Sequence, residues 1–284
     1  MSSKFNLHHR LRVRWAEVDP QGIVFNAHYL TYFDTAMTEY WRALGLPYEA
    51  LVNRFKGDLF VRKTTVEYQD SARFDDLLTV SARCERLGKS SLTFAFALTR
   101  QDSPLVSGEL VYVFASQATR QPSPVPDELR ELINAYEAGK PMYEVRVGDW
   151  TTLGADSRQV RTAVFIDEQK IPPDMEWDDA DHGCLHAVAY NRLGTPVATG
   201  RLLEHVPGVA KIGRMAAVQA VRGGGVGRRV LDALMQAARE RGDREALLHA
   251  QVSACGFYAR AGFVARGPEF DDVGIPHVEM VRPL

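Results

Sequence analysis

The sequence predicts an α+β chain of two domains, and three observations lead to this fold class. The 284 residues are about twice the usual length of one domain. The first half carries one long amphipathic helical pattern and then several strand-like runs. The second half alternates strand-like and helical runs around a glycine-rich turn. We therefore expect a long helix wrapped by an antiparallel sheet, fused to a mixed α/β sheet domain.

The first domain depends on the pattern of residues 28–44. Apolar side chains recur there at the spacing i, i+3, i+4 and i+7, which predicts a helix with one buried face. Gly45 is a suitable helix stop, because glycine readily adopts the left-handed conformation. Runs rich in Val, Leu, Phe and Thr predict strands before and after this helix, at residues 7–15, 59–68, 77–86, 91–99 and 106–116.

The domain boundary is indicated by breakers of regular structure. Residues 117–126 contain three prolines and fit neither a helix nor a central strand. A short amphipathic helix is expected at residues 127–136, and a helix stop and linker at residues 137–141. We therefore expect one domain over residues 1–139 and a second over residues 143–284.

The second domain is centred on a strong helical pattern at residues 226–241, which Gly242 follows. Shorter helices are expected at residues 158–166 and 253–261. Strands are expected at residues 185–190, 196–203, 211–218, 246–251 and 278–281.

Composition excludes several classes of protein. The 34 Lys and Arg against 36 Asp and Glu leave no basic excess for a dedicated nucleic-acid binder. No run approaches the roughly 18 apolar residues of a membrane span, and Met1 to Asn6 show no secretion signal. Three widely spaced cysteines fit a reducing compartment. We therefore expect a cytoplasmic protein without a nucleic-acid or membrane partner.

The glycine-rich turn runs from Arg222 to Gly227, between a predicted strand and the long helix. Successive backbone N–H groups and the positive end of the helix suit a phosphate or pyrophosphate. The dinucleotide pattern fails, because Val230 stands where its third small residue belongs, and the P-loop fails, because Arg228 follows Gly227. A tight turn without a ligand stays open as the alternative.

This segment resembles the pyrophosphate motif of the GNAT acetyltransferases, which Arg222, Gly225 and Gly227 match in register. Phe257 to Phe263 looks like the family's FYxxxGF segment. Residues 164–169 and 274–277 look like its ElaA-like branch, and the resemblance covers residues 143–284. It implies that a coenzyme A thioester (acetyl-CoA or acyl-CoA) is the substrate. The residues that it implies for binding this thioester are Met215, Ala216, Val218, Arg222, Gly223, Gly224, Gly225, Val226 and Gly227.

The resemblance also implies the chemistry. A neutral amine attacks the thioester, and backbone N–H groups of residues 214–218 stabilise the oxyanion. Tyr258 matches the family's tyrosine and is the expected general acid for the leaving thiolate, with a packed aromatic as the alternative. Glu168 and His277 are candidates for the base, or for a structural or substrate-orienting role. The acceptor amine cannot be read from the sequence.

One histidine-cysteine pattern has the residue types of a metal site. His182, Cys184 and His186 would share one face of a strand and could bind zinc. No fourth ligand lies nearby, and the stretch runs into an apolar strand. We therefore predict no metal.

The turn before the first long helix carries a second resemblance. Arg14 to Trp41 is similar to the 4-hydroxybenzoyl-CoA thioesterase group of hotdog-fold proteins, including its YbgC-like and FadM-like branches, and the likeness covers residues 5–136. A turn or capping role for the aspartate of this segment is the alternative. The residues that follow the family pattern are Asp19, Gly22, Asn26, Tyr29, Leu30, Asp34, Tyr68, Ala72 and Asp76.

Thioester hydrolysis is the activity that this resemblance implies. N–H groups at the start of the helix, near Asn26, would polarise the acyl carbonyl, with Gly22 in the preceding turn. Asp19 would attack the carbonyl or activate a water. Asn26 departs from the histidine of many YbgC-like members, so the acyl preference is not inherited. The family implies a homodimer or homotetramer through this domain, and Glu39 is expected to be a solvated or dimer-facing charge.

The sequence therefore predicts a bifunctional enzyme, an acyl-CoA thioesterase fused to a GNAT N-acetyltransferase. One alternative makes the hotdog half a silent dimerisation or acyl-CoA-binding module for the acetyltransferase. Another makes the GNAT half a ligand sensor beside an active hydrolase. A third keeps the hydrolysis and takes the thioester from an acyl-carrier protein.

Overall fold

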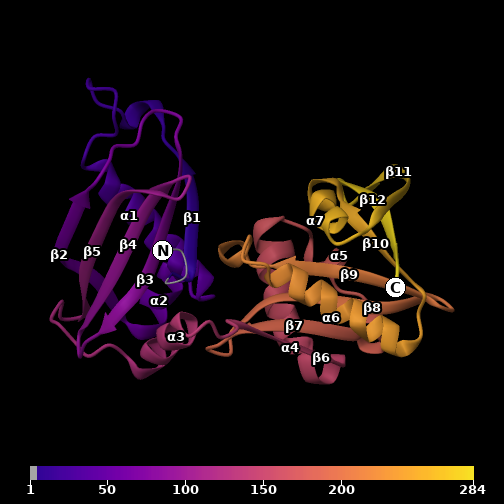
Figure 1. Cartoon of the computed structure of the whole chain (residues 1–284). Helices are drawn as coiled ribbons and strands as arrows, with labels where there is room; N and C mark the ends of the chain where they lie inside the picture. Colours follow the sequence, from indigo (N-terminus) through magenta and orange to yellow (C-terminus); the bar gives the residue numbers. More distant parts are fainter. Residues whose placement is uncertain (1–4) are drawn as a thin grey trace. The chain divides into compact units, whose positions relative to one another are not determined.

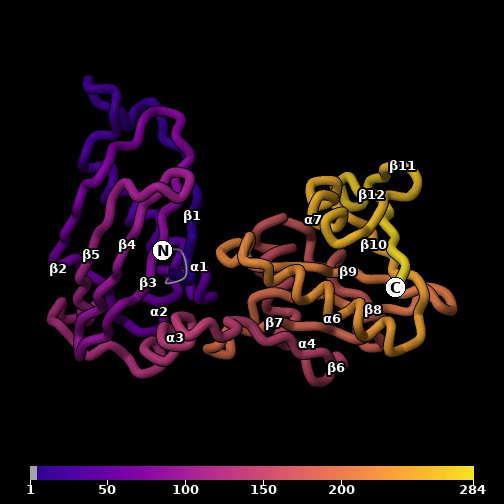
Figure 2. The backbone as a smooth tube through the Cα atoms, in the orientation of Figure 1, coloured from indigo at the N-terminus to yellow at the C-terminus, as the bar shows by residue number. Residues whose placement is uncertain are grey.

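The computed structural model describes residues 5–284, so Met1 to Lys4, part of the stretch expected to lack a secretion signal, lie outside the described residues. The chain separates into two compact units, Met1–Met142 and Tyr143–Leu284 (Figure 1). Figure 2 follows the chain from the last helix of the first unit directly into the first strand of the second. No helix within residues 5–284 is long and apolar enough to cross a membrane.

The first unit is an antiparallel five-stranded sheet in the order β1-β3-β4-β5-β2. The long helix α1 (His28–Ala43) packs against it, with Phe33 stacked on Phe96 at a ring distance of 4.7 Å. Gly108 permits this approach, because a Cβ there would lie 2.4 Å from the Phe33 ring. The elements are β1 (Leu7–Arg12), α1, α2 (Tyr48–Phe55), β2 (Gly57–Tyr68), β3 (Leu77–Leu87), β4 (Ser91–Arg100), β5 (Ser103–Ser116) and α3 (Asp127–Glu137).

The second unit is a seven-stranded mixed sheet in the order β11-β12-β10-β9-β8-β7-β6. Its one parallel pair among the described strands is β9 with β10. The helices α4 and α6 pack on the sheet, and α7 lies beside its far end (Figure 1). The strands are β6 (Tyr143–Gly148), β7 (Leu185–Asn191), β8 (Pro196–Val206), β9 (Val209–Ala217), β10 (Glu245–Gln251), β11 (Val264–Asp272) and β12 (Ile275–Pro283). The helices are α4 (Trp150–Arg161), a π-helix (Thr162–Glu168), α5 (Pro173–Glu176), α6 (Val226–Arg241) and α7 (Cys255–Arg260).

The predicted α+β fold class is confirmed, and the differences lie at particular elements. The predicted helix at residues 158–166 begins earlier, at Trp150, because Asp149 caps it by accepting a hydrogen bond from the Thr152 N–H at 2.9 Å. In the sequence, Gly154 looks like a helix breaker. In the structure it lies within α4, where a larger residue does not fit, because a Cβ there would lie 2.7 Å from the Trp150 ring. The helix then widens into the π-helix.

Other boundaries were wrong by small amounts, and four of the α-helices and strands were not predicted. The first strand ends at Arg12, because Trp15–Glu17 forms a 3-10 turn. The helix expected at residues 253–261 is divided into a 3-10 turn and α7. The unpredicted elements are α2, α5, β6 and β11. β11 is exposed at every position, so it has no alternating pattern.

Candidate functional site

The glycine-rich turn joins β9 to α6 as a concave run of backbone. Gly223 and Gly225 have φ values of 84° and 79°, a left-handed conformation that side chains disfavour. A Cβ at either position would meet nothing within 4 Å, so backbone conformation and not crowding requires these glycines. Gly225 is the N-cap of α6, whose first N–H groups have no acceptor inside the helix. The turn therefore presents several N–H donors and the positive end of a helix dipole, which suits a phosphate.

Arg222 ties this turn to the π-helix. Its guanidinium donates two parallel hydrogen bonds to the Glu168 carboxylate, at 2.7 and 2.6 Å, and a third to the Ala217 carbonyl. The hydrogen bond from Arg222 lowers the pKa of Glu168. Both carboxylate oxygens are engaged and ionised, so Glu168 is a weak proton acceptor. The geometry of Glu168 therefore favours a structural role over the role of a base.

The sheet opens beside this turn. β9 and β10 are paired only from Val209 with Glu245 to Ile212 with Leu248, although both strands continue. The N–H groups of residues 213–217 that face β10 therefore have no strand partner. Met215, Ala216 and Val218 lie along this gap or directly after it, and their part in binding the thioester stays a prediction.

Tyr258 lies on α7 at the same gap. It is 8% exposed, packs against Phe257 and Phe263, and lines a cavity together with Met215 and Gln251. Its hydroxyl makes no hydrogen bond to any residue in the described part of the chain. Burial raises the pKa of Tyr258 to about 12, so the hydroxyl keeps its proton at neutral pH. A protonated hydroxyl without a partner can donate to a leaving group.

The cavity has a volume of about 340 Å³ and is floored by β8, β9, β10 and β12. His277 lines it and lies across from Gln251 in the β10–β12 pairing. The His277 Nδ1 is 2.8 Å from the Ile275 carbonyl, which can only accept, so Nδ1 carries the proton. In the neutral ring Nε2 is then unprotonated and able to act as a base. Tyr258 and His277 therefore share one cavity, whereas Glu168 is not among its lining residues.

His249 also lines this cavity, and sequence reasoning missed it. Its ring lies edge-on to Phe270, on which His277 stacks. Burial, with a smaller contribution from Lys211, lowers the pKa of His249. The alternation of side chains along β10 places His249 on the same face as Gln251. This alternation is the only sequence signal that could have indicated His249 as a site residue.

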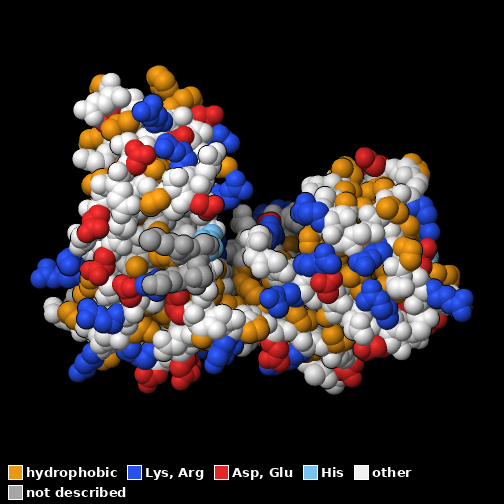
Figure 3. Space-filling model, in the orientation of Figure 1, with side chains coloured by type: hydrophobic (Ala, Val, Ile, Leu, Met, Phe, Trp, Pro, Cys, Tyr) orange, Lys and Arg blue, Asp and Glu red, His pale blue; other side chains and the backbone are white. Residues whose placement is uncertain are grey.

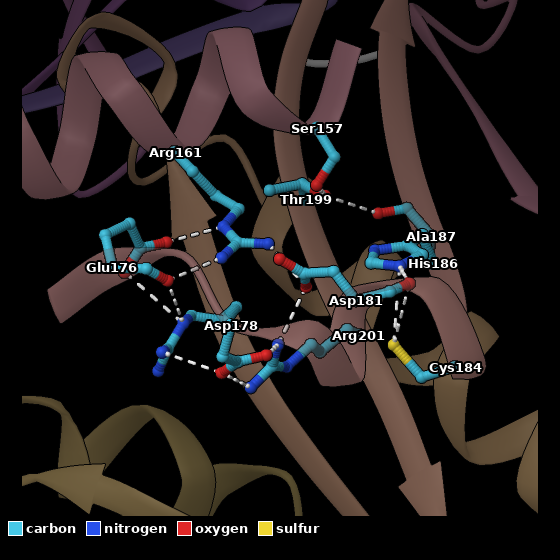
Figure 4. Close-up of polar contacts among 11 residues, drawn as sticks. Ser157, Arg161, Glu176, Asp178, Asp181, Cys184, His186, Ala187, Thr199 and Arg201 are labelled. Carbon is cyan, nitrogen blue, oxygen red and sulfur yellow. Dashed lines mark hydrogen bonds and ion pairs between the residues drawn. The ribbon is translucent and has the colours of Figure 1, made fainter. Parts of the chain in front are cut away.

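An ion network lies beside the cavity, which its members Glu176, Asp178 and Arg201 help to line. Figure 4 shows the polar contacts of this network. Arg161 is fully buried and donates to Glu176 at 2.5 Å and to Asp181 at 2.8 Å. Arg201 donates to the same Asp181 oxygen at 2.7 Å and binds both oxygens of Asp178. Each buried charge has an opposite partner, which is the condition for tolerating charges in the interior.

Acid should loosen this network. The hydrogen bond from Arg201 holds the pKa of Asp178 below its ordinary value of 3.8, so the contribution to folding is present above that value and is lost as pH falls through the lower, folded pKa. We expect the free energy of unfolding to fall more steeply below about pH 4 in the native chain than in Asp178→Asn. Urea titrations from pH 7 to pH 3 measure this. Asp174→Asn, at an exposed position on α5, is the control and should match the native slope.

The three residues of the histidine-cysteine pattern, for which the sequence predicted no metal, do not come together as one group. His182 is exposed and lies against Trp150, whereas Cys184 and His186 are buried, with Sγ 3.3 Å from Nε2 (Figure 4). Asp181 takes the third place in this group. Its Oδ1 already accepts from two guanidinium groups, so a cation would lie beside two positive charges. The residues present do not fit a metal ion.

In the first unit, Asp19 lies in a tight turn before α1. Its Oδ1 accepts from the Gln21 N–H at 2.8 Å, and its carbonyl accepts from the Gly22 N–H at 2.9 Å. Gly22 has φ 78°, so the turn requires glycine. Asp19 is half-buried, and Oδ2 makes no hydrogen bond within residues 5–284. The turn therefore holds the backbone while one carboxylate oxygen stays available.

The start of α1 is more closed than predicted. The N–H groups of His28, Tyr29 and Leu30 donate to the carbonyls of Phe25, Asn26 and Ala27. The N–H groups of Asn26 and Ala27 have no backbone acceptor among the described residues. Asn26 is exposed, and its own carbonyl accepts from the Tyr68 hydroxyl at 3.4 Å. The N–H groups without a backbone acceptor in this described stretch are therefore those of Asn26 and Ala27, the two residues before the helix begins.

Glu17 is a site residue that sequence reasoning missed. It is 5% exposed and accepts from the Tyr32 hydroxyl at 2.7 Å, from the Arg14 N–H and from the Arg14 guanidinium. It anchors the loop two residues before Asp19. A buried carboxylate has no sequence signature of its own, because its partners depend on how the loop folds.

Exposed apolar side chains surround this loop. Trp15 and Phe74 are in edge contact at 5.8 Å, and Figure 3 shows hydrophobic side chains at the surface of this end of the unit. The loops are joined, because the Val24 N–H donates to the Ala72 carbonyl at 2.8 Å. The exposed set near this loop is Trp15, Phe25, Leu30, Tyr68 and Phe74. Phe60 and Val61 are also exposed, but they lie near the start of β2, paired with Val113 and Tyr112. Other predicted positions are peripheral, since Asp34 is exposed, Glu39 pairs with Arg42, and Asp76 binds Arg100.

Comparison with known proteins gives a separate match for each unit. A family model described as the thioesterase-like superfamily matches residues 13–133. A model described as the acetyltransferase (GNAT) domain matches residues 158–284. A Bacillus subtilis protein named as an acetyltransferase is 37% identical over 127 residues, which cover 44% of this chain and 85% of that protein. The uncharacterized N-acetyltransferase YjcF of the same species is 35% identical over 128 residues, which cover 45% and 90%.

Two solved structures are each similar to about half of the chain. An N-acetyltransferase structure from Lactobacillus plantarum is 31% identical, with a TM-score of 0.47, and the match covers 51% of this chain and 99% of that one. A thioesterase from Thermus thermophilus, complexed with coenzyme A and Zn, is 29% identical, with a TM-score of 0.43. That match covers 50% of this chain and 100% of the other.

Proposed function

We propose that this chain is a bifunctional enzyme acting on coenzyme A thioesters. It belongs to the GNAT acetyltransferases through its second half and to the thioesterase-like superfamily through its first. The second unit transfers an acetyl or acyl group to an amine, and the first hydrolyses an acyl-CoA. The observation that carries the proposal is the shared cavity of Tyr258 and His277 beside the gap in the sheet.

In the transferase unit, the coenzyme A pyrophosphate binds the N–H groups of residues 223–227 at the start of α6. The thioester lies between β9 and β10, where unpaired N–H groups of residues 213–217 stabilise the oxyanion. The amine enters from the cavity, and its nitrogen forms the new bond to the carbonyl carbon. His277 Nε2 accepts the amine proton. The C–S bond breaks, and Tyr258 donates its proton to the leaving thiolate.

Glu168 supports the pyrophosphate site and is not the base in this mechanism. We expect Glu168→Gln to leave kcat for acyl transfer within about threefold of the native value, whereas loss of a general base costs about 10²–10⁴-fold. Coenzyme A binding should weaken by up to about fivefold, the scale of one exposed ion pair. Steady-state kinetics and calorimetric titration with coenzyme A measure the two effects. A fall in kcat of a hundredfold would make Glu168 the base.

In the hydrolase unit, the N–H groups of Asn26 and Ala27 receive the acyl carbonyl oxygen at the positive end of α1. Asp19 attacks the carbonyl carbon or removes a proton from a water that does so. The C–S bond then breaks, and the thiolate leaves as free coenzyme A after protonation. Where Asp19 is the attacking group, water then hydrolyses the acyl-Asp19 anhydride, which releases the carboxylic acid and restores the Asp19 carboxylate. The exposed apolar side chains around the loop offer a surface for the acyl chain.

We propose that this unit works as a homodimer or homotetramer. β2 is an edge strand of twelve residues, and most of it is exposed. An unpaired edge of this length invites pairing with a second copy. Such pairing would also cover Phe60 and Val61, which are about half exposed. Sedimentation of the full chain tests this state.

The boundaries of the two functions are proposed at residues 139 and 143, next to the division between the compact units. We place the reaction in the cytoplasm, where free thiols such as those of Cys84, Cys184 and Cys255 persist.

The second candidate function is a GNAT acetyltransferase whose first half only dimerises or binds acyl-CoA. The Oδ1 of Asp19 serves the turn, which favours this reading over a turn built for catalysis alone. Thiol release from a panel of short, long and aromatic acyl-CoAs, without amine, separates the two functions. Turnover supports the bifunctional enzyme. Saturable binding without turnover supports the silent module, and turnover only with acyl-carrier-protein thioesters changes the substrate class.

A further inference from the structure

Arg214 has a backbone conformation that arginine disfavours. Its φ is 49°, in the left-handed region that costs an L-residue about 1–2 kcal/mol. It lies at a β-bulge, because Thr199 pairs with Ala216 and Arg201 pairs with Gly213, so two residues of β9 oppose one residue of β8. A bulge whose first residue is left-handed normally has glycine there.

The β8 residue opposite the bulge is also adapted to it. Gly200 is the single β8 residue facing Arg214 and Met215. A Cβ at Gly200 would lie 2.4 Å from the Met215 Sδ and 2.9 Å from Leu234. β8 therefore leaves room for the Met215 side chain that the bulge directs toward it.

The Arg214 side chain is held by the buried ion network. Its Nε lies 3.2 Å from the Glu176 carbonyl and 3.3 Å from the Glu176 carboxylate, and its Nη2 donates to Asp178 at 3.2 Å. These partners are themselves fixed, since Arg161 holds Glu176 and Arg201 holds Asp178. The network thus reaches β9 through one residue, at the position where the backbone is strained.

The bulge lies at the functional part of β9. The pairing of β9 with β10 ends at Ile212, so Arg214 and Met215 border the gap that receives the thioester in the proposed reaction. A bulge changes the direction of the N–H groups that follow it. Because oxyanion stabilisation depends on donors placed in advance, the shape of this bulge sets the strength of the site.

We propose that Arg214 is a positioning residue for acyl transfer, whose ion pairs with Glu176 and Asp178 hold the β9 bulge that aims backbone N–H groups at the thioester. This inference rests on the proposed transferase function. It assigns the network a second role besides helping to line the cavity, namely keeping a non-glycine residue in the left-handed conformation.

Arg214→Gly and Arg214→Ala test the proposal as a matched pair in the full chain. Both remove the charge and the ion pairs, but only glycine adopts the left-handed conformation without strain. We expect kcat for acyl transfer to be about 5–30-fold higher in Arg214→Gly than in Arg214→Ala, with equal KM for the amine. Equal kcat values, with equal rises in amine KM, would overturn the proposal and make Arg214 an acceptor-binding charge.

Thermal unfolding gives a readout that does not depend on transfer. Glycine usually lowers stability relative to alanine, but here Arg214→Gly should melt about 2–4 °C above Arg214→Ala. The reverse order would show that position 214 is not held left-handed, and would overturn the proposal. If the order holds but the native chain transfers no acyl group to any amine, the proposed function fails and the positioning role fails with it.

Gly200→Ala reaches the bulge from the other strand, without touching Arg214 or its partners. Its added methyl group must displace Met215, so we expect kcat to fall at least about tenfold with amine KM unchanged. Native kcat in Gly200→Ala, measured on a variant with an intact melting transition, would contradict the proposed importance of the bulge.

Discussion

Asp19→Asn releases thiol from acyl-CoA about 10²–10⁴-fold more slowly than the native chain, which is the expected cost of removing a nucleophile or general base. The asparagine amide oxygen can still accept the Gln21 N–H bond that Asp19 Oδ1 accepts at 2.8 Å. The turn therefore survives, and the loss comes from the missing charge at Oδ2. Thiol release is followed without amine, because acyl transfer also liberates coenzyme A.

The control for Asp19→Asn is amine-dependent transfer by the same preparation, which should equal that of the native chain. Asp34→Asn, at an exposed position of α1, should leave hydrolysis unchanged. Native hydrolysis in Asp19→Asn would remove Asp19 from the mechanism. A parallel loss in both activities would indicate misfolding instead of lost chemistry.

Tyr258→Phe lowers kcat for acyl transfer by about 10²–10⁴-fold, because the leaving thiolate loses its proton donor. Phenylalanine keeps the packing against Phe257 and Phe263, so coenzyme A binding and stability should stay close to native. Burial raises the pKa of Tyr258 to about 12, so ionisation of this hydroxyl should not limit the native rate between pH 6 and 9. Initial rates with a panel of amines measure both effects.

A matched control for Tyr258→Phe is Tyr190→Phe, because Tyr190 is also buried but binds Asp156 and is not among the cavity-lining residues. It should retain native transfer. Unchanged kcat in Tyr258→Phe across all amines would leave Tyr258 as a packed aromatic, the alternative that the sequence left open. It would favour a ligand-sensing role for the second unit.

The elements that were predictable from sequence are those whose pattern is local. The apolar spacing of residues 28–44 gave α1 within one residue, and residues 226–241 coincide with α6. Both family resemblances are confirmed, because the thioesterase-like model matches residues 13–133 and the GNAT model matches residues 158–284. β6 and β11 were missed because edge strands carry little apolar alternation. The start of α4 was missed because Gly154 serves a contact with Trp150 that no local rule reveals.

The site residues also fall into those that a local motif predicts and those that depend on tertiary structure. The sequence singled out Tyr258 and His277, and the structure brings them to one cavity. It named Glu168 as a candidate base, yet the pairing with Arg222, 54 residues away, depends on tertiary structure. Arg161 looks like a surface arginine in the sequence and is fully buried, because Glu176 and Asp181 fold over it. The left-handed conformation of Arg214 could not be predicted, because glycine is the residue that usually marks such a position and arginine is not.

The central claim is that one chain holds two separate sites for coenzyme A thioesters. The most direct test is a single assay that records thiol release and acylated amine together, for the native chain, Asp19→Asn and Tyr258→Phe. The account predicts that Asp19→Asn loses only amine-independent thiol release and Tyr258→Phe loses only the acylated amine. One variant abolishing both activities in folded protein, or a native chain lacking either activity with every acyl-CoA and amine, would contradict it.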